Sequence, residues 1–269
     1  MRHDQPGITQ VIGTLPYRMA LAGGWIDQPF ISQWNPNPPG AMVVVSLEPE
    51  FHFMERSGMG TSTRKAAMNL WGNHLPEGNP AELVRALYWA ENEGKTDPSG
   101  SQDMAGLVYP GISRLDYDFD YQGGVFPVHV ESCNQSAVVE WLEQSIFLLP
   151  VAQRPSGYHP LGIKNLDPEW IAKLGGSGRD CFTAIVARDL FGLGEAMNTC
   201  MRCWEVILPQ VLYHELITVD LAGLLKFYQE RYAGAMYSGC GGGYLIVASD
   251  EPVPGGFQLK IRYEPEEVS

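Results

Sequence analysis

Three glycine-rich segments lie far apart in this chain of 269 residues. They read AGGWIDQP (residues 22–29), SGMGTST (57–63) and GAMYSGCGGGY (234–244). The last contains three consecutive glycines, which are expected where the backbone must pass close to a ligand or to another loop. The order and spacing of the three segments constrain the fold more than any one of them does alone.

The charge of the chain narrows the choice of partners. Lys and Arg are outnumbered 18 to 31 by Asp and Glu, which gives a formal net charge of -13. Nucleic acids and anionic membranes are bound mainly through clustered cations, so neither is an expected partner. The first ten residues lack the apolar stretch of a secretory signal, and no apolar run reaches the roughly 18 residues of a membrane span. We therefore expect a cytoplasmic protein that acts on a small molecule, while its oligomeric state stays open.

The cysteines indicate reduced, buried thiols. Their count is five, and an odd number in a chain of this length argues against a disulfide framework. Cys200 and Cys203 have C-x-x-C spacing, but they lie in a helical pattern and no second pair accompanies them. Packing inside the protein is therefore a better interpretation of this pair than zinc or redox chemistry.

The first half of the chain alternates between sheet and helix signals. Residues 41–47 (AMVVVSL) are rich in β-branched side chains and follow the breaker run NPNPPG at 35–40, which predicts a strand. Residues 79–91 predict a helix, with Asn79 as its cap and a proline at its first position. Asp103 falls in a stretch of Pro, Gly and Ser that is typical of a loop. The other expected elements are a helix at 65–71 and strands at 11–13, 18–22, 114–121, 125–130 and 145–150.

The second half is expected to be mostly helical and to end in strands. A loop at 153–160 precedes helical patterns over 167–232, which Pro209 and Gly223 are expected to interrupt. The apolar runs after the last glycine-rich segment predict a hairpin with strands at 244–249 and 257–263.

The segment SGMGTST could bind phosphate. Small residues at a helix start leave backbone N–H groups free, and the positive end of the helix dipole attracts an anion. The candidate phosphate-binding residues are Ser57, Gly58, Met59, Gly60, Thr61, Ser62 and Thr63. On its own the segment is a weak signal, because such clusters more often form a capped turn, and it lacks the G-K-[ST] ending of a Walker A loop.

Together the three segments resemble the motifs of the GHMP family of small-molecule kinases, over nearly the whole chain. Arg18 and Asp27 stand nine positions apart, as the arginine and the sugar-binding aspartate do in the first motif of its sugar kinases. The form GGWIDQP is most similar to fucokinase-like proteins and next to heptose 7-phosphate kinases. A fourth segment, PSGSQDMA (98–105), resembles the setting of the catalytic aspartate in the sugar branch.

This resemblance implies an α+β, two-lobed fold, with an N-terminal lobe at 1–150 that carries the phosphate loop and a C-terminal lobe at 151–269. It also implies an ATP- and Mg²⁺-dependent sugar kinase that phosphorylates the anomeric 1-hydroxyl, with a sugar or a sugar phosphate as its substrate. Asp103 would orient or deprotonate the sugar hydroxyl, and Arg18 would stabilise negative charge on the aspartate and on the transferred group. Ser62 and Glu91 would hold Mg²⁺, which takes hard oxygen ligands. The resemblance further assigns Gly239 and Gly241 to the nucleotide, and Gly24, Trp25, Asp27 and Gln102 to the sugar.

The sequence departs from the family at the nucleotide site. Only 30 residues separate Asp27 from Gly58, fewer than the family usually devotes to holding the adenine. Arg64 and Lys65 follow the phosphate loop, where they oppose the helix dipole unless an anion or a carboxylate is near, and they are candidates to bind phosphate themselves. These departures motivate an alternative, a protein that binds a sugar or nucleotide as a sensor or scaffold without turnover. A kinase for mevalonate or homoserine-type substrates fits the sugar-branch residues less well.

Two further sets of residues have two interpretations each. Arg154, Tyr158 and His159 either line the substrate pocket or belong to a surface loop, and the surface loop is the more frequent case. Trp25 either stacks on a sugar face or is an ordinary core residue.

Overall fold

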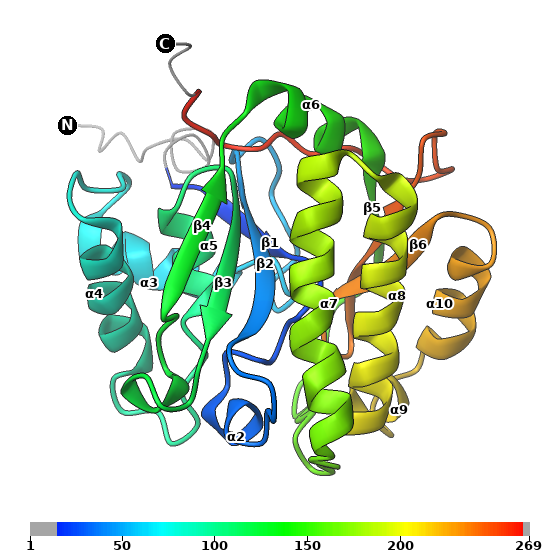
Figure 1. Cartoon of the computed structure of the whole chain (residues 1–269), viewed down its shortest axis with the longest axis horizontal. Helices are drawn as coiled ribbons and strands as arrows, with labels where there is room; N and C mark the ends of the chain where they lie inside the picture. Colours follow the sequence, from blue (N-terminus) through cyan, green and yellow to red (C-terminus); the bar gives the residue numbers. More distant parts are fainter. Residues whose placement is uncertain (1–14, 266–269) are drawn as a thin grey trace, which may run out of the picture.

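Two antiparallel sheets organise the chain in the computed structural model, which describes residues 15–265 (Figure 1). The first sheet has the order β1 (Tyr17–Ala20), β2 (Gly40–Leu47), β3 (Ile112–Tyr117) and β4 (His129–Cys133). The second has the order β5 (Ile146–Ala152), β7 (Gly242–Ala248) and β6 (Gly234–Gly239). Every residue of β2 is buried, because this apolar strand lies between β1 and β3 and packs against helices.

Helices connect and cover the sheets. They are α2 (Pro29–Ser32), α3 (Thr61–Trp71), α4 (Pro80–Asn92), α5 (Gln102–Val108), α6 (Ser136–Ser145), α7 (Pro168–Ala187), α8 (Leu190–Ile207), α9 (Gln210–Tyr213) and α10 (Leu221–Gln229), with a 3-10 turn at Gln122–Gly124. Side-chain caps mark several starts: Asn79 accepts a hydrogen bond from the Ala81 amide (2.9 Å), and Asp167 accepts one from the Glu169 amide (2.8 Å). The long helices α7 and α8 run side by side (Figure 1).

The predicted elements of the first half are largely confirmed. The strands expected at 41–47 and 145–150 and the helices expected at 65–71 and 79–91 are β2, β5, α3 and α4. The strand expected at 18–22 is present as β1, while the one at 11–13 lies outside the described residues. Helix α6 was not anticipated.

Three expectations for the first half were wrong. The strand expected over 114–121 ends at Tyr117, because Asp118 starts a turn in which its carboxylate accepts a hydrogen bond from the Asp120 amide (3.0 Å). The strand expected over 125–130 begins only at His129. Asp103, expected in a loop, is the second residue of α5.

The second half also departs from the prediction in its hairpin. Residues 257–263 do not pair with β7; instead, Phe257 forms a bridge with Leu148 of β5 and Ile261 forms one with Leu47 of β2. Strand β7 pairs with β5 on one side and with β6 on the other, so the third glycine-rich segment itself forms the β6–β7 hairpin. Pro209 does separate α8 from α9. Gly223 lies inside α10, where its amide donates to the Asp220 carboxylate that caps the helix (2.9 Å).

The cysteines of the chain are free and buried, as expected. Cys200 and Cys203 both lie on α8, and the Cys200 Sγ accepts a hydrogen bond from the Gly23 amide (3.3 Å). Burial raises the pKa of the Cys203 thiol to about 11, so it is protonated at neutral pH. Cys200 therefore helps to hold the first glycine-rich turn against the second half of the chain.

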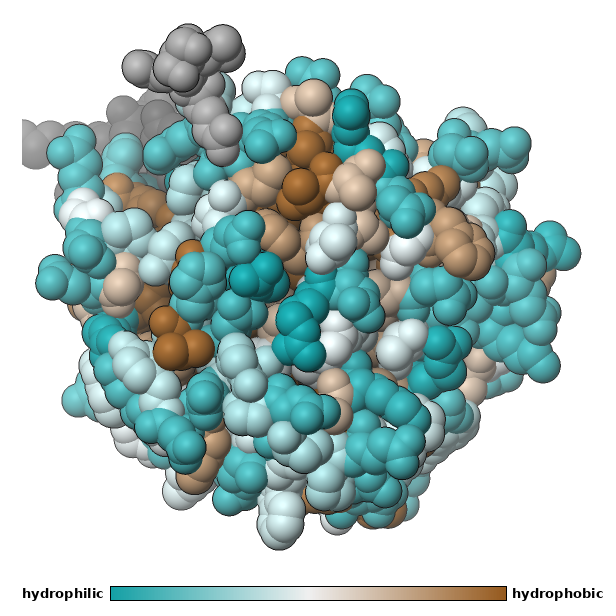
Figure 2. Space-filling view, in the orientation of Figure 1, coloured by the Kyte–Doolittle hydropathy of each residue, from teal (hydrophilic) through white to brown (hydrophobic). Residues whose placement is uncertain are grey.

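The surface is mostly hydrophilic on the face shown in Figure 2, where hydrophobic residues form small, separate groups. Within residues 15–265, no helix combines the length and the apolar character that crossing a bilayer requires.

Helix α7 approaches β2 without side chains between the two backbones. A Cβ on Gly178 would overlap the carbonyl oxygen of Ala41, whereas a Cβ on Gly176 would meet no atom within 4 Å. We expect Gly178→Ala to lower the free energy of unfolding by about 3 kcal/mol or more, because α7 would have to move off the sheet. Gly176→Ala is the matched control and should raise it by up to about 1 kcal/mol. Urea unfolding of both variants measures this, and equal effects would contradict the close packing.

Candidate active site

One cavity of about 240 Å³ brings the sequence segments together. Its wall combines β1 and the turn after it, the phosphate loop, the start of α5 and the β6–β7 hairpin. The predicted site residues that line it are Arg18, Gly24, Trp25, Asp27, Gly58, Gly60, Thr61, Ser62, Gln102, Asp103 and Gly239. Predicted residues up to 221 positions apart in the sequence therefore share one cavity.

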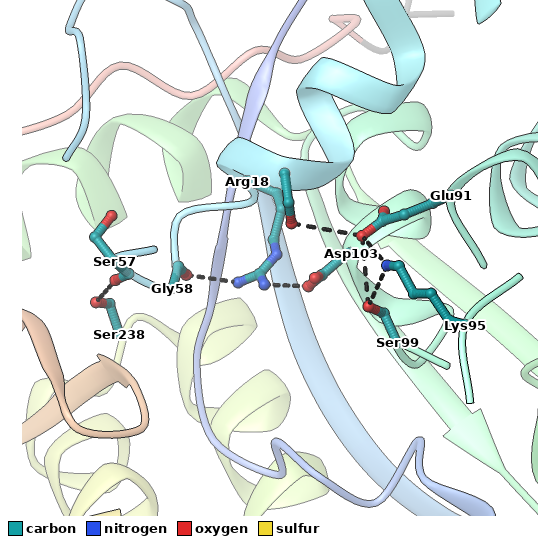
Figure 3. A network of polar contacts seen from close by, with 9 residues as sticks. Arg18, Ser57, Gly58, Glu91, Lys95, Ser99, Asp103 and Ser238 are labelled. Atoms are coloured by element: carbon teal, nitrogen blue, oxygen red, sulfur yellow. Dashed lines mark hydrogen bonds and ion pairs between the residues drawn. The ribbon is translucent and has the colours of Figure 1, made fainter. Parts of the chain in front are cut away.

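Of the remaining predicted residues, Glu91 does not line this cavity but a second pocket, which also contains Ser62. The others do not line the cavity either, and they contact the segments that form its wall. Ser57, Met59 and Thr63 are completely buried. The Ser238 hydroxyl donates to the Ser57 carbonyl (2.6 Å), which joins the phosphate loop to the C-terminal hairpin (Figure 3). Gly241 packs against the ring of Tyr158.

The phosphate loop needs its glycines. Gly58 and Gly60 have φ angles of 78° and 70°, which L side chains rarely adopt. A Cβ on Gly58 would also overlap the Ser238 carbonyl. Helix α3 begins directly after Gly60, and none of the described side chains caps its first turn. Its free amides and its dipole therefore form a site for an anion.

Arg18, which is buried, and Asp103, which is partly exposed, form an ion pair beside this loop (Figure 3). The same guanidinium donates to the Gly58 carbonyl (2.8 Å), so it links the catalytic candidate to the phosphate loop. Arg18 lies at the side of Gly60 and Gly106, where a Cβ at either position would crowd its side chain. The guanidinium and the N-terminus of α5 both stabilise negative charge on Asp103.

The start of α5 is fixed by Ser101, which the sequence placed in the sugar-branch motif without a role of its own. The Ser101 hydroxyl donates to the Val125 carbonyl (2.6 Å) and lies 2.9 Å from the Tyr117 hydroxyl. Ser101 is completely buried. These contacts hold Gln102 and Asp103 at the cavity, and they join parts of the chain that no local pattern connects.

Asp27 is buried at the cavity with one oxygen unsatisfied. It is 2% exposed, and its Oδ2 has no hydrogen-bond partner within the described part of the chain. Burial, and then the nearby charge of Asp103, raise the pKa of Asp27 from its usual 3.8 to about 7. Gly100 leaves room for this carboxylate, because a Cβ there would overlap Oδ2. The Gln102 side-chain oxygen, also buried, lacks a partner as well.

Glu91 and Ser62 lie together, as the resemblance implied, but a lysine joins them. The Glu91 Oε1 lies 3.4 Å from the Ser62 hydroxyl, 3.4 Å from the Ser99 hydroxyl and 3.3 Å from the Lys95 ammonium (Figure 3). Its Oε2 is buried and unpartnered among residues 15–265. A carboxylate with a free oxygen and two hydroxyls suits Mg²⁺, which needs few protein ligands. Over the same residues, no group of three or more His, Cys, Asp or Glu side chains could hold a metal ion.

The two cations after the phosphate loop do not line this cavity, although Lys65 lines the second pocket together with Ser62 and Glu91. Arg64 turns away, donating to the Leu15 carbonyl (3.0 Å) and covering the Tyr17 ring (4.6 Å to the centroid). Lys65 forms an exposed ion pair with Glu55 (3.0 Å), a carboxylate that offsets its conflict with the helix dipole. Neither side chain lines the cavity.

The loop after β5 contributes one of its three candidates. Arg154 lines the cavity, whereas Tyr158 is buried beneath it and donates to the Gln210 carbonyl (3.1 Å). His159 is exposed and does not line the cavity. Trp25 does line it, and its indole N–H contacts the Cys240 Sγ (3.2 Å).

Trp204 and Arg56 also line the cavity and were not assigned to it from the sequence. Trp204 reaches it from α8, and its indole N–H donates to the Gly24 carbonyl (2.9 Å). Its sequence surroundings are those of any buried helix residue, so no local signal could have assigned it to the site. Arg56 precedes the phosphate loop, and its position there was the available signal.

Comparisons with known proteins identify the fold from the three-dimensional structure and not from the sequence. No family model matches the chain, and no curated protein matches its sequence. A mevalonate kinase structure matches with a TM-score of 0.60 at 12% identity, covering 93% of this chain and 98% of that one. A Lactococcus lactis galactokinase complexed with galactose matches with a TM-score of 0.58 at 12% identity, covering 93% and 92%. A D-glycero-D-manno-heptose 1-phosphate kinase from Bacteroides thetaiotaomicron gives 0.57 at 12% identity, covering 93% and 96%.

These structural neighbours are kinases of the GHMP family. The chain therefore has the α+β fold of GHMP kinases, as the resemblance of its glycine-rich segments implied.

Proposed function

We propose that the protein is an ATP-dependent sugar kinase that transfers the γ-phosphate of ATP to a sugar hydroxyl, the anomeric 1-hydroxyl. One observation carries the proposal: the Arg18–Asp103 pair is bonded to the phosphate loop in the same cavity that Asp27 lines. This arrangement supports the proposal, because the Asp103 carboxylate, which would act on the acceptor, lies beside the loop that would hold the phosphates of the donor. Phosphoryl transfer depends mainly on such positioning and on charge neutralisation.

The roles follow from the contacts. The amides at the start of α3 would hold phosphate oxygens. Asp103 would accept the proton of the attacking hydroxyl, and Arg18 would stabilise the charge that develops on the transferred group. The unpaired oxygens of Asp27 and Gln102 are buried acceptors, which suit the hydroxyl donors of a sugar.

Mg²⁺ would be held by Glu91 and Ser62, and it would neutralise charge on the phosphates when bound. The lobes would divide at residue 150, within β5, and the protein would act in the cytoplasm.

The test is ADP release with Mg-ATP across a panel of free hexoses, deoxyhexoses, heptose phosphates and cyclitols. The panel identifies the acceptor, and product NMR identifies the phosphorylated hydroxyl. If protein shown to be folded by its thermal transition releases no ADP with any acceptor, the proposal is overturned.

A second candidate function is a sugar- or nucleotide-binding protein without turnover. The observation that favours it is Lys95, whose ammonium lies at the Glu91 carboxylate where Mg²⁺ would be held. Calorimetry separates the two candidates, because tight sugar binding without ATP binding supports the second and ATP-dependent turnover excludes it.

The metal assignment gives two variants with opposite expectations. Glu91→Gln should weaken Mn²⁺ binding in the presence of ADP by about 10-fold or more, because it removes the charged ligand. Lys95→Gln should strengthen it, because a competing cation is removed from Glu91. Electron paramagnetic resonance of bound Mn²⁺ measures both without turnover. The exposed Glu93→Gln is the control, and an unchanged affinity in Glu91→Gln would remove Glu91 from the metal site.

A further inference from the structure

Strand β4 has an open edge. It is the outer strand of the first sheet, and within residues 15–265 its only strand neighbour is β3 (Figure 1). In an outer strand, every second residue points its N–H and C=O groups away from the sheet, where another strand can pair with them. His129 and Glu131 on β4 are exposed, and Val128, which precedes the strand, is 46% exposed. A second strand can therefore reach this edge.

One face of the edge carries balanced charges. Glu131 forms an ion pair with Arg114 of β3 (3.0 Å), and the His129 Nδ1 lies 3.3 Å from the Asp116 carboxylate. His129 and Glu131 lie on the same face, because alternate residues of a strand do so. With the imidazole protonated, these four side chains hold two cations and two anions. The patch thus adds no net repulsion of its own, although the chain has a net charge of -13.

The other face of the edge is apolar. Val128 continues the line of the strand, because its amide donates to the Asp116 carbonyl of β3 (2.8 Å). Val128 and Val130 line a groove of about 360 Å³, whose wall also includes Val84 of α4. A strand that pairs with β4 would therefore need an apolar side chain on this face and charges that complement those on the opposite face.

A second copy of β4 meets both requirements in one antiparallel register. A two-fold axis normal to the sheet keeps the apolar faces of both copies on one side, so each residue lies opposite a residue of its own face. When Val130 lies opposite Val130 of the second copy, each Glu131 lies opposite His129 of the other copy. Apolar side chains then meet at the axis, and opposite charges across the strands stabilise the pair.

The neighbouring registers are unfavourable. A shift in one direction places His129 opposite His129 of the second copy, and a shift in the other direction places Glu131 opposite Glu131. Like charges directly opposite each other destabilise a strand pair. Pro127 has no N–H to donate, so the pairing covers residues 128–132. The charge pattern of β4 therefore favours a single register.

We infer that the open edge of β4 is the docking surface for a second copy of this chain, with the two-fold axis at Val130. The two four-stranded sheets then join edge to edge. Two-fold dimers are the commonest symmetric assemblies of soluble proteins. The inference concerns a surface outside the cavity and is independent of the proposed kinase function.

The first experiment is analytical ultracentrifugation at pH 6, which favours a protonated imidazole. We expect the mass to rise with concentration from that of one chain to that of two. Glu131→Lys should weaken the association by about 10-fold or more, because it places like charges opposite each other on both sides of the axis. Glu140→Lys changes the charge of an exposed residue on α6 by the same amount, and this control should leave the association unchanged.

The second experiment tests the register with cysteines. Val130→Cys places two thiols at the axis, where the Cα separation of an antiparallel pair, about 4.5 to 5.5 Å, permits a disulfide. Val128→Cys is the matched control, because its two thiols would lie about 13 Å apart along the strands. We expect mild oxidation to cross-link the Val130→Cys protein into a dimer on a non-reducing gel and to leave the Val128→Cys protein as single chains.

Thermal transitions establish that each variant is folded. The mass of a single chain at every concentration would overturn the inference and would leave the edge to another segment of this chain or to a different protein. A dimer that Glu131→Lys does not weaken would also overturn it, because the contact would then lie elsewhere. Equal cross-linking of the Val130→Cys and Val128→Cys proteins would contradict the register.

Discussion

Asp103→Asn is expected to lower kcat for phosphate transfer by about 10³-fold, the largest effect of any single substitution in this site. The amide cannot accept the proton of the attacking hydroxyl, and it removes the negative charge that faces Arg18. ADP release at saturating Mg-ATP and acceptor measures the loss. Binding of the ATP analogue should change little, because the amides at the start of α3 are untouched.

The Asp103→Asn protein must fold for this result to be informative, and the asparagine side chain is compatible with folding. Its side-chain oxygen can still accept a hydrogen bond from Arg18, which also keeps its bond to the Gly58 carbonyl. We therefore expect a lower but cooperative thermal transition, since a buried cation loses its counter-charge. Asp118→Asn, in the turn after β3, is the matched control and should retain full activity. Activity within 10-fold of the native protein would remove Asp103 from the chemistry.

Asp27→Asn should have two opposite effects, a more stable protein and a poorer enzyme. In the folded protein the pKa of Asp27 is raised to about 7, against 3.8 for an ordinary aspartate. Folding therefore disfavours the ionised carboxylate and lowers the free energy of unfolding. This loss of stability is absent below pH 4, grows between pH 4 and 7, and is constant above pH 7. The difference corresponds to at most about 4 kcal/mol at pH 8. The neutral asparagine carries no such cost.

Urea unfolding at pH 4 and pH 8 tests whether Asp27→Asn raises or lowers the free energy of unfolding. The gain in the free energy of unfolding should be near zero at pH 4 and about 2 to 4 kcal/mol at pH 8. The exposed Asp250→Asn is the control and should show no such dependence. The acceptor KM of Asp27→Asn should rise about 10- to 100-fold, because a charged hydrogen-bond acceptor is lost. A variant that is less stable than the native protein at pH 8 would contradict the raised pKa.

Local signals explain which parts of the fold could be predicted. The β-branched run of β2 and the Asn79 cap of α4 each lie within one short segment, and both elements were found. The segment 257–263 has an equally good strand pattern, but its partners are Leu148 and Leu47, far away in the sequence. Pattern alone could not distinguish that pairing from a hairpin, because hydrophobic alternation does not identify the neighbouring strand.

The residues of the site also divide into those that could be assigned from the sequence and those that could not. Arg18, Asp27 and the phosphate loop could be assigned because their spacing matches a known arrangement, and the structure brings them to one cavity. Lys95 beside Glu91 and Trp204 beside Gly24 had no such signal. Asp103 was assigned to the site but to the wrong element, because its Pro/Gly/Ser surroundings conceal the start of α5.

The bond from Ser238 to the Ser57 carbonyl has a consequence for synthesis in the cell. The two residues are 181 positions apart, and their segments also pack together at two glycines. Gly58 lies against the Ser238 carbonyl, and Gly243 lies against the Ser57 carbonyl. At about 5 to 20 residues per second, the ribosome makes the first partner about 10 to 40 s before the second. During that interval the nascent chain has this loop without its supporting hairpin. In the proposed kinase, bound nucleotide would therefore assist folding only after nearly the whole protein has been translated.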